Sequence, residues 1–229
     1  ALGKGDWIVK GAHEYGGKVI ATVVNARHAK RAEEYGADGV IATGHEAAAH
    51  GEAVTSLILV PSLVDAVKIP VIAAGGIYTG ADIGRILDLG ASGVQMATRF
   101  VTTHECDADA AFKQAYVDAR PEDLVIIKSP VGLPGRAIRN RFIEEVRDGL
   151  RKPFRCIYHC ITTCKMNEAP YCIAMALSNA RLGKLRNGFA FAGTNAPRAT
   201  GIQSVKDVMA AIVSEYEAAK RPGFQASPV

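Results

Sequence analysis

The chain has 229 residues, of which 48% are hydrophobic and 22% are charged, so it can bury a core of ordinary size in one large domain or two small ones. Its formal charge of +4 is mild and its basic residues are scattered, which argues against a nucleic-acid groove and favours small anions as ligands. No stretch approaches the ~20 apolar residues of a membrane span, and no basic segment followed by an apolar one opens the chain. We therefore expect a cytoplasmic protein that enters no membrane.

A strand–helix repeat runs through the first part of the chain. Four short apolar or β-branched runs predict strands, at Lys18–Val24, Gly39–Thr43, Val71–Ala74 and Val94–Ala97. The segment KVIATVV…EEYGADGVIAT parallels PVIAAGG…LDLGASGVQMAT, strand for strand and glycine for glycine. Candidate helix caps follow the first and third strands: Asn25, Thr79 and Asp82. Right-handed crossovers in series wind a barrel or a doubly wound sheet, and repetition of one βα unit favours the barrel.

Two regions are expected to depart from this repeat. Residues 44–53 predict a polar loop at the strand end where barrels carry their chemistry, and Ser56–Val67 predicts an apolar helix packed outside. Beyond Phe100, the pattern predicts helices at 107–119, 139–150, 171–182 and 204–219, a strand at 124–127 and a Pro/Gly loop at 129–136. We therefore predict a barrel portion at residues 1–128 and a mainly helical extension, packed on it, at 129–229.

Four small residues at two strand ends suggest an anion site. Gly75 and Gly76 follow the third strand, and Ala97 and Thr98 follow the fourth. A parallel crossover places these ends side by side, where bare backbone N–H groups can face one anionic ligand. Glycine pairs after strands also serve as plain tight turns, and taken alone the pair leaves both interpretations open. The paired arrangement favours a phosphate cradle.

His50 is the candidate general base. It lies in the expected loop after the second strand, five residues from His45 and four from Glu46. A lone loop histidine is commonly a solvated surface residue, but imidazole at the catalytic end of a barrel strand can remove a carbon-bound proton. His45 has the weaker claim. A His-x4-His spacing with one glutamate is no recognised metal set, so we expect no metal here.

The cysteine pattern leaves more than one interpretation open. Five cysteines, an odd number, favour free thiols in a reducing compartment over a disulfide framework. Cys156, Cys160, Cys164 and Cys172 have the spacing C-x3-C-x3-C-x7-C, which could ligate zinc or an iron–sulfur cluster. On a helix these positions would line one face and serve as small packing residues, the interpretation that we favour. Cys106 has no visible base partner and is not predicted to be a nucleophile.

Three motifs in order carry a family resemblance: EAAAHGE at Glu46–Glu52, PVIAAGGI at Pro70–Ile77 and GVQMATRF at Gly93–Phe100. With their spacing, they resemble the nitronate monooxygenase family, formerly called 2-nitropropane dioxygenases. The resemblance runs from Lys18 to about Ala219. It implies an α/β fold of TIM (β/α)8 barrel type with a C-terminal helical extension, FMN as cofactor, and oxidation of nitronates or nitroalkanes with oxygen.

The resemblance also assigns roles to individual residues. His50 matches the family's active-site histidine, the base toward the nitroalkane or nitronate. Positions that match the family's cofactor contacts are Thr22, Ala48, Ala49, Gly75, Gly76, Gln95, Ala97 and Thr98. Among these, Gly75 and Gly76 match one half of the flavin phosphate site and Ala97 and Thr98 the other. The segment Gly193–Asn195 resembles one that reaches over the substrate.

Departures from the family pattern bear on these assignments. Ala48, Ala49 and Ala97 stand where many members have glycine, and Thr22 stands where many have a lysine near the flavin ring. Four barrel strands are evident, against the eight that closure needs, so we expect an incomplete barrel whose N-terminal strands are absent. A homo-oligomer or a missing N-terminal segment is then expected to cover its open sheet edges.

Alternative functions remain at this point. A flavin-dependent enoyl-ACP reductase is the nearest rival, because those enzymes are close relatives of the family. Barrels similar to IMP dehydrogenase share the PVIAAGGI pattern, but they need a nucleophilic cysteine in a loop after a strand, and no cysteine here occupies one. A non-catalytic half-barrel that binds a phosphate ligand or a partner subunit is the alternative of a different class.

Overall fold

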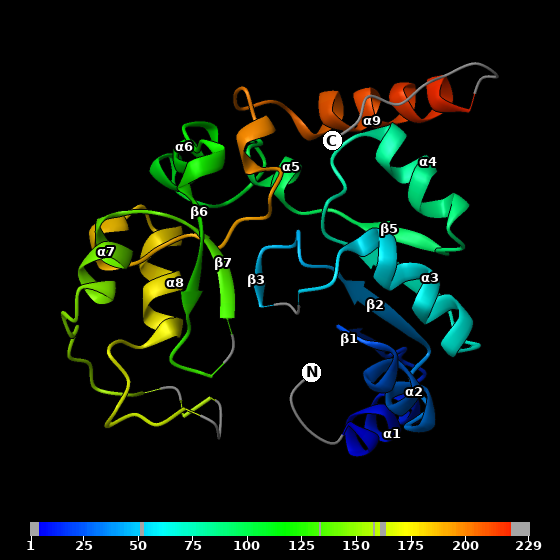
Figure 1. Ribbon diagram of the computed structural model, residues 1–229, viewed down its shortest axis with the longest axis horizontal. Coiled ribbons are helices and arrows are strands. Elements are labelled where there is room, and N and C mark those ends of the chain that lie inside the picture. Colours follow the sequence, from blue (N-terminus) through cyan, green and yellow to red (C-terminus); the bar gives the residue numbers. More distant parts are fainter. Residues whose placement is uncertain (1–4, 51–52, 133, 158, 161–163, 221–229) are drawn as a thin grey trace. The chain divides into compact units, whose positions relative to one another are not determined.

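The computed structural model describes residues 5–50, 53–132, 134–157, 159–160 and 164–220. The chain forms two compact units, coloured along the sequence in Figure 1. The first unit comprises Ala1–Ala47, Glu52–Met96 and Asp207–Val229, and the second comprises Ala48–Gly51 and Ala97–Lys206. The predicted boundary at residue 128 divides the chain in another way, into a barrel portion and a helical extension. That boundary stays a prediction. In the part of the chain that the structure describes, no helix is both long and apolar enough to cross a bilayer.

A four-stranded parallel sheet organises the first unit. Its strands, in the spatial order β1-β2-β4-β5, are β1 Ile20–Val23, β2 Gly39–Thr43, β4 Val71–Ala74 and β5 Gly93–Gln95. The register pairs Thr43 with Ala74, and Ala74 with Gln95. Because all four strands are parallel, their carboxyl ends meet at one edge of the sheet. The predicted α/β fold is confirmed, and these are four of the eight strands of a complete barrel.

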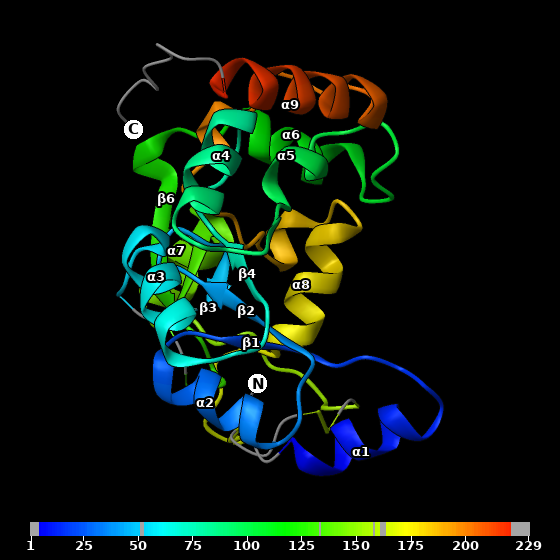
Figure 2. The ribbon, with the colours of Figure 1, turned by 90° about the vertical axis from the view of Figure 1, so that its right-hand side faces the viewer.

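Three helices follow strands of this sheet and lead to the next one: α2 Ala26–Glu34, α3 Ser56–Ala66 and α4 Gly80–Asp88 (Figure 2). Helix α1 Asp6–Glu14 precedes β1, and α9 Val205–Ala219 comes from much later in the sequence. The core of this unit consists of alternate strand residues such as Val40, Ala42 and Ala73 packed against Leu63 and Ile86. Burial of this apolar face is what holds the helices on the sheet.

The predicted helix caps are present. The Asn25 side chain accepts a hydrogen bond from the His28 N–H at 2.9 Å. Thr79 and Asp82 form a reciprocal capping box at the start of α4. Each satisfies N–H groups that a helix terminus leaves without partners, which is why these short polar side chains begin the helices.

α9 packs against the first turn of α4. The Gly80 N–H donates to Glu215 Oε2 at 2.8 Å, across 135 positions of sequence. A Cβ atom at Gly80 would meet backbone atoms of Ile212 and Tyr216, so only glycine fits where the two helices come together. This close contact joins the end of the chain to the βα repeat.

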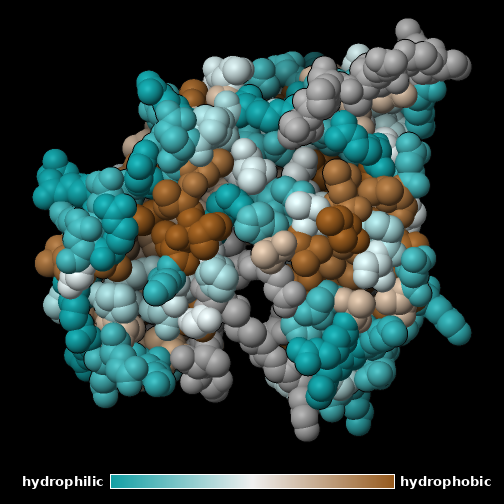
Figure 3. Space-filling view, viewed as in Figure 1, coloured by the Kyte–Doolittle hydropathy of each residue, from teal (hydrophilic) through white to brown (hydrophobic). Residues whose placement is uncertain are grey.

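The second unit contains a three-stranded antiparallel sheet in the order β3-β7-β6. Its strands are β3 Ala49–His50, β6 Leu124–Lys128 and β7 Pro134–Ile138. Its helices are α5 Thr98–Val101, α6 Ala110–Val117, α7 Arg141–Arg147 and α8 Ile173–Arg181, with short 3-10 helices at Pro121–Asp123, Leu185–Asn187 and Ala196–Arg198. Figure 3 shows apolar side chains gathered over β6, where Ile126 is 53% exposed.

Two loop predictions in this unit are wrong in part. The Pro/Gly loop predicted at 129–136 ends earlier, because β7 begins at Pro134, which pairs with Lys128 at the first position of the strand. Proline is tolerated there, since the first residue of a strand need not donate to the ladder. The polar loop predicted at 44–53 contains β3, which pairs with β7. The first error concerns a hairpin in which Lys128 and Pro134 pair across a short turn, and the second concerns pairing between distant segments, which local patterns do not reveal.

Aromatic rings form part of the core of the second unit. Phe142, Tyr171 and Phe189 contact one another with centroid separations of 5.1 to 5.9 Å, and Phe189 is fully buried. Burial raises the pKa of Tyr171 to about 12. A cavity of ≈ 460 Å³ lies between β6 and α7 beside this cluster, and none of the predicted site residues is among the described residues that line it.

Candidate functional site

The turn after β4 is built from two glycines in left-handed conformations. Gly75 has φ of 96° and Gly76 has φ of 74°, values that other residues adopt only with strain. Among the hydrogen bonds of the described residues, none is donated by the N–H group of Gly75 or Gly76. Two successive N–H groups in this conformation make a concavity that suits an anion.

The loop after β2 lies directly against these glycines. A Cβ atom at Gly75 would lie 2.8 Å from the Ala47 nitrogen, and one at Gly76 would lie 3.3 Å from Glu46 Cγ. The Gly44 N–H donates to the Ala74 oxygen at 2.9 Å, which continues the sheet by one residue. The glycine pair therefore also has a packing role, in addition to any role in binding.

A buried polar network fixes this loop. Ser56, the first residue of α3, is 2% exposed, and its hydroxyl donates to the Gly75 oxygen at 2.8 Å. The Glu46 carboxylate accepts a hydrogen bond from the Ser56 N–H at 3.0 Å, and its Oε2 also lies 3.2 Å from the Ser56 hydroxyl oxygen. A carboxylate at a helix N-terminus is favoured by the helix dipole and satisfies one of the first N–H groups. The pair could not be predicted from the sequence, since ten positions separate the two residues.

Thr22 and Gln95 lie on the sheet face opposite the helices. The register aligns Thr22 with Ile41, Ile72 and Gly93, and aligns Gln95 with Ala74 in the next row on the same face. Both side chains are exposed. Thr22 and Gln95 belong to the two edge strands, β1 and β5. Three strand spacings, about 14 Å, separate these strands, so only a large flat ligand could contact both residues.

The remaining predicted residues belong to the second unit. Ala48 precedes β3, and in β3 Ala49 pairs with Arg136 and His50 with Gly135. His50 is therefore part of an antiparallel pair rather than an irregular loop. Ala97 directly follows Met96, where the chain passes from the first unit to the second, and Thr98 begins α5. The first unit thus brings together Gly75, Gly76 and the end of β5, and the second unit holds the other half of the predicted set.

A buried lysine supports α5. Lys113 is 8% exposed, and its ammonium group donates to the carbonyl oxygens of Thr103 at 2.8 Å and His104 at 3.4 Å. The Thr103 hydroxyl in turn donates to the Phe100 oxygen at 2.8 Å. A cation near the carbonyl end of a helix is electrostatically favourable and here fixes the turn that follows α5. The role of Lys113 could not be predicted from the sequence, because its helical position alone predicts a solvated side chain.

The expectation of no metal at His45, Glu46 and His50 stays a prediction, because the His50 side chain lies outside the description. Among the side chains that are described, no three histidine, cysteine, aspartate or glutamate groups converge on a single ion position.

Comparisons with known proteins agree with the motifs. The sequence model of the nitronate monooxygenase family matches residues 4–215. A probable nitronate monooxygenase of Staphylococcus aureus is 38% identical over 149 residues, covering 61% of this chain and 42% of the relative. A (3aS,4S,5R,7aS)-5-hydroxy-7a-methyl-1-oxo-octahydro-1H-indene-4-carboxyl-CoA dehydrogenase of Mycobacterium tuberculosis is 35% identical over 154 residues, covering 66% of this chain and 43% of the relative.

Solved structures of two enzymes have a fold similar to that of this chain. FabK from Thermotoga maritima superposes with a TM-score of 0.80 at 31% identity, covering 95% of this chain and 66% of FabK. Nitroalkane oxidase from Streptomyces ansochromogenes superposes with a TM-score of 0.76 at 24% identity, covering 94% of this chain and 62% of that enzyme, and shows the fold alone. The chain spans about two fifths of the length of the curated relatives it matches. With a family match over nearly its whole length, the chain belongs to the nitronate monooxygenase family.

Proposed function

We propose that this chain is part of an FMN-dependent oxidoreductase that oxidises a nitronate or nitroalkane with oxygen. The observation that carries the proposal is the turn at Gly75 and Gly76, which lies at the carboxyl edge of a parallel sheet and offers two N–H groups that donate to no other described residue. Parallel α/β proteins bind ligands at this edge. Membership of the family supplies the cofactor class and the substrate class.

The residues at the sheet edge fit one half of an FMN phosphate site. Gly75 and Gly76 would hold phosphate oxygens through their N–H groups, and Ala97 and Thr98 would complete the set. Thr22, Gln95, Ala48 and Ala49 would line the rest of the cofactor. The hydrogen bond from the Ser56 hydroxyl to the Gly75 oxygen holds the glycine turn in place, which lowers the ordering cost of binding.

His50 would remove the proton from the carbon next to the nitro group. Imidazole titrates near neutrality, and a base held close to its proton donor accelerates such a step by about 10²–10⁴. Bound FMN would supply the oxidation of the substrate and the reaction with oxygen. The pairing of β3 with β7 fixes the backbone at His50.

Two histidine variants test the assignment of the base. His50→Ala should lower turnover of a nitroalkane by about 10²–10⁴ while retaining bound FMN. His45→Ala is the matched control, since His45 is exposed, lies five positions earlier and is not assigned a role. Turnover is measured as oxygen consumption, and bound FMN as visible absorbance. Equal activities of the two variants would reject His50 as the base, and a colourless wild-type protein would reject the cofactor.

A reductase or dehydrogenase acting on a thioester is the second candidate. The relative from Mycobacterium tuberculosis acts on a carboxyl-CoA compound, and FabK superposes over 95% of this chain. Mixing the flavin-loaded protein with NAD(P)H in the absence of oxygen separates the candidates. Rapid bleaching of the flavin absorbance favours the reductase, and slow or absent bleaching favours the nitronate oxidation. A protein that binds phosphate but never flavin would instead be a non-catalytic half-barrel.

A further inference from the structure

Strand β6 forms one edge of the antiparallel sheet in the second unit. The order β3-β7-β6 gives it a partner on one side, and among the described residues no strand pairs with its other side. Its sequence, LVIIK, is apolar up to the last residue, and Ile126 is 53% exposed. Proteins usually shield an apolar edge strand, because it pairs readily with another chain. This edge is therefore open to a further strand.

The ladder with β7 identifies the backbone groups of β6 that face the open edge. The Arg139 N–H donates to the Asp123 oxygen at 2.6 Å, directly before the first paired residues of the two strands. Hydrogen-bonded and non-hydrogen-bonded pairs alternate along an antiparallel ladder. Leu124, Ile126 and Lys128 therefore direct their N–H and C=O groups away from β7, toward the open edge.

Antiparallel pairing with β6 of a second copy would satisfy these groups. About a twofold axis at Ile126, the Ile126 N–H of each copy would donate to the Ile126 oxygen of the other, and each Lys128 N–H to the Leu124 oxygen. The Leu124 N–H already donates to the Pro121 oxygen within its own chain, and this arrangement does not require it. Every donor left at the edge then has an acceptor.

The charges at the two ends of β6 favour an antiparallel partner. The turn before the strand carries Glu122 and Asp123, and the strand ends at Lys128. The Arg139 guanidinium pairs with Asp123 at 2.9 Å, whereas Glu122 and Lys128 have no ion pair among the described residues. Antiparallel pairing brings Lys128 of each copy to the acidic turn of the other. Parallel pairing would instead bring like charges together.

An apolar cavity lies beside the open edge. It has a volume of ≈ 460 Å³, and Phe142, Ile143 and Val146 line its α7 side. Val125 and Ile127 point to this face of the sheet, since both pack against the core that contains Phe142. A twofold axis perpendicular to the sheet keeps the same face of both copies on one side, so Val125 and Ile127 of the second copy would point toward the cavity. Apolar side chains of a paired strand therefore suit this space.

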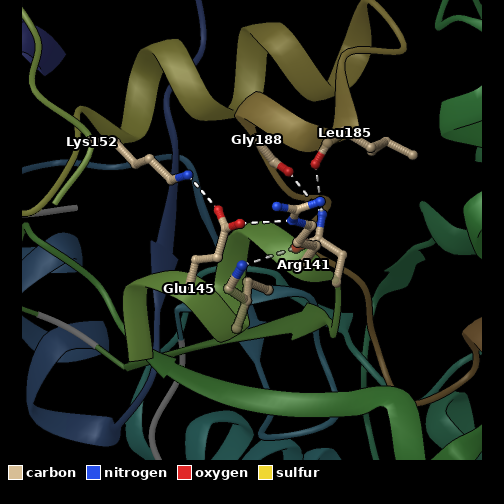
Figure 4. Close-up of polar contacts among 7 residues, drawn as sticks. Arg141, Glu145, Lys152, Leu185 and Gly188 are labelled. Atoms are coloured by element: carbon tan, nitrogen blue, oxygen red, sulfur yellow. Dashed lines mark hydrogen bonds and ion pairs between the residues drawn. The ribbon is translucent and has the colours of Figure 1, made fainter. Parts of the chain in front are cut away.

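Polar contacts fix α7, which forms one wall of the cavity. Lys152 and Arg141 reach the Glu145 carboxylate from either side, and Arg141 Nε lies 2.7 Å from Glu145 Oε1 (Figure 4). The Asn140 side chain, at the start of α7, donates to the Gly188 oxygen at 2.8 Å. The wall is therefore already in place, and a docking strand would not have to order it.

We propose that two copies of this chain associate by antiparallel pairing of their β6 strands, which joins the two antiparallel sheets into one continuous sheet. The same surface serves both partners, so the assembly closes as a twofold dimer. This edge belongs to the second unit and is distinct from the edges of the parallel sheet. The association requires neither cofactor nor substrate.

Analytical ultracentrifugation of the 229-residue chain over a range of concentrations tests the proposal. The wild type should show a reversible equilibrium between monomer and dimer. Lys128→Glu should raise the dissociation constant of the dimer by about tenfold or more, because opposite charges at both ends of the pair become like charges. Adding Glu122→Lys to this variant should restore most of the affinity. Lys184→Glu, at an exposed position of the same unit, is the matched control and should equal the wild type.

A second variant tests the backbone contacts. Ile126→Pro removes the N–H group that faces the open edge and leaves the ladder with β7 intact, as edge strands tolerate. The dissociation constant should rise by about 30-fold or more, because one hydrogen bond is lost from each copy. Circular dichroism checks that the variant is folded. The charge variants change only exposed side chains, so their result stands if the proline variant does not fold.

Three outcomes would overturn the proposal. A wild type that stays monomeric at every concentration shows that the edge does not bind a second copy. A dimer that Lys128→Glu leaves unchanged uses another surface. A dimer that Lys128→Glu weakens but Glu122→Lys does not restore is not paired antiparallel about Ile126. Because association is measured directly, none of these results depends on whether the protein binds a flavin.

Discussion

Replacing Gly75 with alanine should destabilise the first unit through two separable effects. The left-handed conformation, with φ of 96°, costs a residue with a Cβ atom about 1–2 kcal/mol. The Cβ atom would also lie 2.8 Å from the Ala47 nitrogen, a contact with backbone that a rotamer change cannot relieve. Overpacking of this kind costs about 1–3 kcal/mol. The two effects together predict a loss of about 2–5 kcal/mol in the free energy of unfolding.

Gly16→Ala isolates the first effect, the conformational cost. Gly16 belongs to the same unit and has φ of 78°, but nothing lies within 4 Å of the Cβ position. The variant should therefore show only the conformational cost, and the difference between the two variants should be about 1–3 kcal/mol. In urea titrations followed by circular dichroism, that difference moves the midpoint by roughly 0.5–1.5 M for a slope of about 2 kcal/mol/M. Equal midpoints would mean that the loop after β2 does not lie against Gly75.

Two further variants test the polar contacts of the first unit. Ser56→Ala should lower the free energy of unfolding by about 1–3 kcal/mol, because the partly buried Gly75 oxygen loses its donor. Ser92→Ala, at an exposed position, should change it by less than about 0.5 kcal/mol, and thermal melts of both variants check the difference. The hydrogen bond from Lys18, with others from His13 and the Val19 N–H, lowers the pKa of Asp38, so its stabilising contribution is present above about pH 4 and is lost as the pH falls further. In Asp38→Asn, the free energy of unfolding should fall less steeply below pH 4 than in the wild type. Acid titrations followed by ellipticity check this, and curves of the same shape for the two proteins would contradict it.

The βα repeat could be predicted because its signals are local. Strand runs such as Val71–Ala74 are short and apolar, and the caps at Asn25 and Thr79 lie within three positions of the N–H groups they satisfy. The glycine turn at Gly75 was visible for the same reason, since a left-handed conformation selects glycine at that position alone. Features that depend only on neighbouring residues can be predicted without the rest of the fold.

The parts that sequence analysis missed depend on contacts between distant segments. β3 exists because two residues pair with β7 more than eighty positions later, and no period-2 pattern marks so short a strand. Ser56 reads as an ordinary helix start, and only the fold places its hydroxyl under Gly75. The spacing of the cysteines fits a helix face, yet Cys156, Cys160 and Cys164 lie outside any helix. A hydrogen bond from the Lys152 N–H to the Pro170 oxygen joins the two ends of this segment, and the cysteine spacing gives no sign of that contact.

The contact between Gly80 and α9 bears on the order in which the protein folds during synthesis. The second unit is complete when Lys206 has been added, whereas the first unit still awaits Asp207 and the residues that follow. Ribosomes add about 5–20 residues per second, so the helix start at Gly80 waits roughly 7–27 seconds for Glu215, 135 positions later. Throughout that interval the nascent βα repeat exposes the surface that α9 will cover, and it is then that chaperones and proteases have access to it.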